Sequence, residues 1–233
     1  MVNGLIENAS ILIRDAEKTN NPDALWEHCE LMLKKAYDLT MICNKKLSVK
    51  DADRTAILEE TVKPTIKLIE KILEIAEKCL SGIQNPSGKV SVAYICPKCT
   101  EIQEQSGKCP KCDVVLEKQI DYILKMSDKL LKEIKPENAD SLMTTCEQMM
   151  KKAVAKIKKC SSMRAEDKPL TAEIAQAAKD SIELVKKSVE VSNKYLSLSL
   201  EIKKSEQKPT DGKLGTEKPE PKPTDGKSGA EKK

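Results

Sequence analysis

Two identical tetrapeptides constrain the fold of this chain more than any other feature, because residues 96–99 and 109–112 both read Cys-Pro-Lys-Cys. A Cys-x2-Cys turn places two sulfurs on the same side of a tight loop. Two such turns facing each other form the tetrahedral all-sulfur shell that Zn²⁺ prefers. The spacing, with nine residues between the turns, therefore predicts one metal site with the ligands Cys96, Cys99, Cys109 and Cys112. Two disulfides or four unbound thiols are the alternative, but the repeated Pro-Lys favours the metal.

The neighbouring residues are also informative. Tyr94-Ile95-Cys96-Pro97 precedes the first turn, and Ser106-Gly107-Lys108 leads into the second, with Leu116 after it. This pattern resembles the small heavy-metal-binding domain, which reads roughly Tyr-Thr-Cys-Pro-Met-His-Pro and then Pro-Gly-Lys-Cys-Pro-x-Cys-Gly-Met-x-Leu. That family occurs beside metal-efflux adaptors, metal-pumping ATPases and copper-handling proteins. The resemblance covers only residues 94–117 and implies a role in heavy-metal homeostasis.

The chain departs from that family at two places. Lys98-Cys99-Thr100 stands where the family has Met-His-Pro, and Asp113-Val114 stands where it has Gly-Met. The imidazole and both thioethers are thereby lost, which leaves four cysteines. Such a ligand set is more typical of a closed structural zinc site than of a labile soft-metal site. Fe in a rubredoxin-like site has the same paired spacing, although Tyr94 is the one aromatic residue close by, and Cu is a further candidate ion.

An internal duplication flanks the cysteine turns. Residues 29–36 match residues 146–153 at an offset of 117, and Cys43 falls on Cys160 at the same offset. Further along the offset becomes 116, so that residues 65–69 match residues 181–185. Each copy has the apolar periodicity of three helices, near 4–18, 22–46 and 52–81 in the first copy and near 118–135, 139–161 and 170–204 in the second. Pro22 favours a helix start, and Pro64 predicts either a kink or the true start of the third helix.

These patterns predict a mainly α protein. We expect a helical bundle of two three-helix repeats (1–84 and 118–204), with a zinc-ribbon-like four-cysteine β element (85–117) inserted between them. In that element the side chains of residues 90–95 alternate in character as they do in a β-strand, and residues 114–116 are the expected pairing partner. From residue 205 the chain is mostly Lys, Pro, Glu, Gly and Thr, so we expect a disordered tail over 205–233.

The second helix of each copy carries cysteine and methionine on one stripe. Core packing is the first interpretation, since buried Cys acts as a small hydrophobe and Met fills gaps. A second soft-metal site is the alternative. If the duplicated helices pack antiparallel, Cys29 meets Cys160 and Cys43 meets Cys146, with a methionine one turn from a thiol of each pair. Two thiolates with a thioether suit Cu(I). The candidate ligands are Cys29, Met32, Cys43, Cys146, Met149 and Cys160. Disulfides are the third option.

Other function classes find little support. Nucleic-acid recognition is poorly supported because the net charge is only +4, the aromatic content is 2% and arginine occurs three times. No catalytic set or phosphate loop is visible, so we do not expect an enzyme. No apolar run approaches a membrane span, and no signal peptide is visible. Nine cysteines in a metal-like pattern favour the cytoplasm, or the periplasm if a signal has been removed. A metal ion is the expected partner. The alternative function is a helical protein-interaction scaffold in which zinc merely staples the small element, and this alternative implies a protein partner. The oligomeric state is left open.

Overall fold

The computed structural model describes residues 22–49, 53–81, 90, 92–165 and 172–206, together with the single positions 4, 7, 11 and 14. Over these residues the chain is mainly helical and has one small antiparallel sheet beside the cysteine turns, which confirms the predicted fold class. The predicted first helix near 4–18 and the predicted tail beyond residue 206 lie largely or wholly outside the described residues. No described helix is both long and apolar enough to cross a membrane.

The first repeat contains a long helix and a composite one. Helix α2 (Pro22–Leu47) begins at the predicted proline, which has no N–H to leave unpaired in a first turn. After a short break, α3 (Arg54–Ile57), the π-helix η1 (Leu58–Val62) and α4 (Lys63–Ser81) follow without interruption. Pro64 is therefore the second residue of α4 and marks its start. The wider π turn directly before Pro64 accommodates a residue that cannot donate to the carbonyl four positions back.

The second repeat contains three helices, as predicted. Helix α5 (Gln119–Glu133) is followed by a short 3-10 turn, η2 (Pro136–Asn138), and then by α6 (Asp140–Ala165). Helix α7 (Ala172–Glu206) completes the repeat and extends two residues beyond the predicted end at 204. Prolines do not occur inside α5 or α6, which is consistent with their regular geometry.

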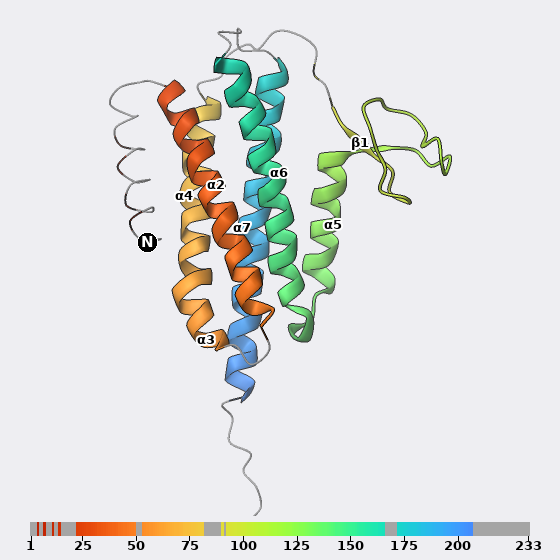
Figure 1. Ribbon diagram of the computed structural model, residues 1–233. Helices are drawn as coiled ribbons and strands as arrows, with labels where there is room; N and C mark the ends of the chain where they lie inside the picture. Colours follow the sequence, from red (N-terminus) through yellow and green to blue (C-terminus); the bar gives the residue numbers. More distant parts are fainter. Residues whose placement is uncertain are drawn as a thin grey trace, which may run out of the picture.

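The two repeats share one hydrophobic core. Helices α2, α4, α6 and α7 form a four-helix bundle, and α5 packs on its outside against α6 and α7 (Figure 1). Helices α2 and α6 lie side by side and run in opposite directions. Their register is fixed where the Asn44 amide of α2 donates to the Met143 carbonyl (3.1 Å) and to the Glu147 carboxylate of α6. Neither repeat therefore has a core of its own within the described residues.

The small sheet lies beside α5, away from the bundle core (Figure 1). Its strands are β1 (Tyr94–Ile95), β2 (Ile102–Gln103) and β3 (Glu117–Lys118), in the antiparallel order β2-β1-β3. The predicted strand over 90–95 is thus shorter than expected, and its predicted pairing with residues 114–116 is wrong. That segment instead pairs locally, because Val115 bridges to Lys108 and the Leu116 N–H donates to the Gly107 carbonyl.

Candidate metal centre

The two cysteine turns are built in the same way, 13 residues apart. In the first turn the Cys96 N–H donates to the Glu101 carbonyl (2.9 Å) and the Thr100 N–H donates to the Cys96 carbonyl (2.8 Å). In the second turn the Cys109 N–H donates to the Val114 carbonyl (2.8 Å) and the Asp113 N–H donates to the Cys109 carbonyl (2.9 Å). The same local sequence therefore folds twice into the same hydrogen-bonded loop, which presents both of its sulfurs on one side.

A left-handed residue closes each turn. Thr100 has φ 59° and Asp113 has φ 54°, and they occupy the same position directly after the second cysteine. Aspartate tolerates this conformation because its short polar side chain bonds locally, whereas a β-branched threonine is strained there. Threonine gives no signal for a left-handed position and aspartate gives only a weak one, so the sequence reasoning did not identify these two residues as part of the site.

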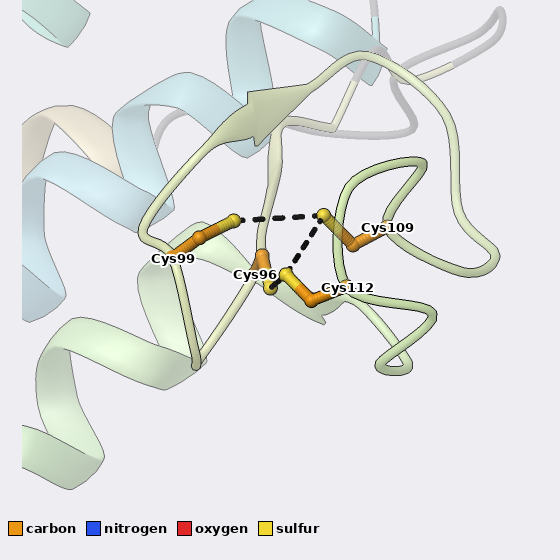
Figure 2. A group of neighbouring side chains, drawn as sticks. All are labelled: Cys96, Cys99, Cys109 and Cys112. Atoms are coloured by element: carbon orange, nitrogen blue, oxygen red, sulfur yellow. Dashed lines mark hydrogen bonds between the residues drawn. The ribbon is translucent and has the colours of Figure 1, made fainter.

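All four predicted ligands come together. Their sulfurs lie within 4.8 Å of one another, with 3.5 Å between Cys96 and Cys112, between Cys99 and Cys109 and between Cys109 and Cys112 (Figure 2). A tetrahedron of sulfurs about 2.3 Å from a central Zn²⁺ has edges of about 3.8 Å. The four cysteines are free thiols, so the disulfide alternative is wrong for this cluster. Among the described residues this is the one group of three or more His, Cys, Asp or Glu side chains with ligand atoms so close together.

The electrostatics of the cluster favour a cation. The backbone N–H groups of Cys99 and Lys98 hydrogen-bond to the Cys96 sulfur and, against the effect of burial, lower its pKa to about 6. Hydrogen bonding with the Cys99 thiol, together with burial, raises the pKa of Cys112 far above its usual value. One thiolate therefore forms readily near neutral pH at Cys96, whereas Cys112 keeps its proton. A divalent ion would replace the remaining protons and hold all four sulfurs as thiolates.

A small shell supports the ligands. Cys96, Cys109 and Leu116 are buried together, with Tyr94 and Val114 packed against them. This cluster is separate from the main core. Two ion pairs lie at its surface. An exposed pair joins Lys108 and Asp113 (3.0 Å), and a second pair joins Lys111 and the half-buried Glu101 (3.1 Å).

The cysteine turns are connected directly to the bundle. Strand β3 ends at Lys118, and the next residue, Gln119, is the first of α5. The Gln119 N–H donates to the Ala93 carbonyl at 2.9 Å, so the chain entering β1 also pairs with the first turn of α5. Lys125 of α5 then contacts the Glu117 carboxylate at 3.1 Å. The position of α5 is thereby coupled to the sheet that the cysteine turns hold.

The helical cysteines lie in the shared core rather than at a visible site. Cys29, Cys43, Cys146 and Cys160 are all buried, and none of them forms a disulfide. Burial raises the pKa of Cys43, Cys146 and Cys160 to about 11, so these three remain protonated near neutral pH.

Three of these thiols, those of Cys43, Cys146 and Cys160, have a partner within their own repeat. The Cys43 sulfur lies 3.8 Å from the Thr65 hydroxyl, and the Cys146 sulfur lies 3.1 Å from the Ser192 hydroxyl. The Met149 sulfur accepts a hydrogen bond from Ser127 of α5 at 3.4 Å. The antiparallel α2–α6 register places Cys43 level with Cys146, as the soft-metal hypothesis requires, and Cys43 contributes to raising the pKa of Cys146. Metal binding by these residues stays a prediction.

No protein-family model, curated protein or solved structure matches this chain. The resemblance to the heavy-metal-binding domain accordingly rests on the motif at residues 94–117 alone.

Proposed function

We propose that this chain is a zinc-binding protein in which Cys96, Cys99, Cys109 and Cys112 hold one structural Zn²⁺. The ion would staple the small sheet and fix it to α5, so that the bundle and the ribbon together act as a protein-interaction scaffold. The observation that carries the proposal is the convergence of four free thiols, within 4.8 Å of one another, from two equivalent turns.

The chemistry of the donor set supports zinc in a closed site. Four thiolates fill a tetrahedral shell and leave no position for water or substrate, which is the arrangement of structural rather than catalytic zinc sites. The ribbon also has few means of folding without an ion. Its buried cluster is small, and its three strands have two residues each. A segment of this size is typically held by a metal or by disulfides.

Elemental analysis of protein purified without added metal tests the proposal. We expect one equivalent of zinc per chain and a colourless sample. Changing Cys96, Cys99, Cys109 and Cys112 to serine should abolish binding, and the matched change of Cys29, Cys43, Cys146 and Cys160 to serine should leave one equivalent bound. Retention of the ion by the first variant would overturn the assignment. A red sample containing iron would replace zinc with a rubredoxin-like electron-transfer site.

An exchangeable site in heavy-metal homeostasis is the second candidate. It is favoured by the exposure of Cys99, which is the most exposed residue of the four. The rate of metal loss separates the two candidates. A chelator in excess should strip an exchangeable site within minutes while helicity is unchanged. A structural site should lose its ion slowly, together with the ordered sheet.

A further inference from the structure

The outer face of α2 carries a short seam of side chains that point away from the bundle core. Its members are Leu31, Lys35, Asp38 and Ile42, spaced by four, three and four residues, so they form one stripe along three turns of the helix. Leu31 is 57% exposed and Ile42 is 43% exposed. Two large aliphatic side chains therefore flank a lysine and an aspartate on the surface.

The duplicated helix α6 shows that the fold does not require this seam. At the offset of 117, the counterparts of the four residues are Gln148, Lys152, Ala155 and Lys159. These counterparts carry no exposed aliphatic side chain larger than alanine, and both of their charges are positive. On α6, Gln148 and Lys152 line a hollow beside α5, whereas the described residues leave Leu31 and Ile42 of α2 about half exposed.

We propose that the α2 seam binds the same seam of a second copy of this chain, in an antiparallel twofold contact. The 4-3-4 spacing is symmetric about its centre, so the seam is complementary to itself. Leu31 would pack on Ile42 of the partner subunit, and Ile42 on the partner's Leu31. Lys35 would pair with Asp38 of the partner subunit, and Asp38 with the partner's Lys35. A twofold axis makes every such contact twice, which is the isologous arrangement of most dimers.

Charge and size both favour this occupant. In an antiparallel contact, the order apolar, positive, negative, apolar places each apolar residue opposite an apolar one and each charge opposite a charge of the other sign. The α6 counterparts would instead place Lys152 opposite alanine and Lys159 opposite an amide. The seam from residue 31 to 42 spans about 16 Å of helix, at about 1.5 Å per residue. Such a contact is smaller than the roughly 1,200–2,000 Å² of a stable interface. The dimer should therefore be weak and readily reversible.

Sedimentation of the full-length, metal-loaded chain over 1–500 µM, an assay range of about three decades, tests the dimer. We expect a reversible monomer–dimer equilibrium. Leu31→Gln with Ile42→Lys, which installs the α6 residues, should leave a monomer with an unchanged circular dichroism spectrum. A wild type that is monomeric throughout would overturn the proposal, and so would a dimer that this double variant does not weaken. Dimerisation that appears only after residues 1–21 are deleted would assign the face to that segment instead, and would equally overturn it.

A charge swap gives the sharper test. Lys35→Asp alone opposes two aspartates on each side of the axis, and Asp38→Lys alone opposes two lysines, so each should weaken the dimer by about tenfold. Both changes together restore opposite charges across the axis and should recover the wild-type affinity. Lys152→Asp on α6, an equal change of charge, is the matched control and should have no effect. Failure of the double variant to recover would exclude this register.

Discussion

The left-handed threonine in the first cysteine turn predicts that Thr100→Gly strengthens the metal site. Thr100 is exposed and has φ 59°, a conformation that costs an L-residue about 1–2 kcal/mol and that glycine adopts freely. Glycine also makes the unfolded chain more flexible, which removes about 0.5–1 kcal/mol of that gain. The hydrogen bond from the Thr100 hydroxyl to the Cys99 carbonyl is exposed and contributes little. The net gain should be about 1 kcal/mol.

Because folding of the ribbon and metal binding are coupled, this gain should appear as a roughly fivefold tighter apparent affinity. The assay is competition between the protein and a chromophoric zinc chelator at pH 7.5. Two variants serve as controls. Thr100→Val keeps the β-branched strain and should not tighten binding. Asp113→Gly should change affinity little, because aspartate tolerates φ 54° and its replacement also loses the ion pair with Lys108. Equal or weaker binding by Thr100→Gly would refute the link between backbone strain and metal affinity.

Three further outcomes follow from the helical core. Burial raises the pKa of Cys43 from 9.0 to about 11. The Cys43 thiol therefore loses its proton at lower pH in the unfolded chain than in the folded one, and the free energy of unfolding should fall between about pH 9 and 11. Urea melts should show this fall, and the fall should be smaller in Cys43→Ala. Asn44→Asp places a carboxylate beside Glu147 and removes the bridge between α2 and α6, so it should cost about 1–3 kcal/mol in a urea melt. Ala153→Leu overpacks a fully buried position and should lower the free energy of unfolding by about 1–3 kcal/mol. Ala155→Leu, on the exposed side of α6, should leave it almost unchanged. Equal thermal midpoints for the two variants would contradict the packing described for α6.

Much of the site could be predicted because its determinants are local. A Cys-x2-Cys turn brings two sulfurs together with little help from the rest of the chain, and the repeat of the motif implies a second pair. The helix starts at Pro22 and near Pro64 were predictable for a similar reason, since proline limits the backbone wherever it stands. The strand partners were not predictable. The segment over 114–116 is apolar enough to form a strand, but the second cysteine turn uses its backbone groups first.

By itself, then, the sequence determined which four thiols lie together, which of the described segments are helical and that the second helices of the repeats are equivalent. The tertiary structure alone decided that both repeats share one core, that α5 lies outside it beside the metal turns, and that Thr100 and Asp113 take left-handed backbone conformations. It also decided that Cys43 and Cys146 face hydroxyl groups of their own repeats. The physical reason is the distance along the chain over which each determinant acts. Turn geometry and helix periodicity arise from neighbours a few residues apart, whereas a shared core and the partner of a buried thiol depend on contacts between segments distant in the chain.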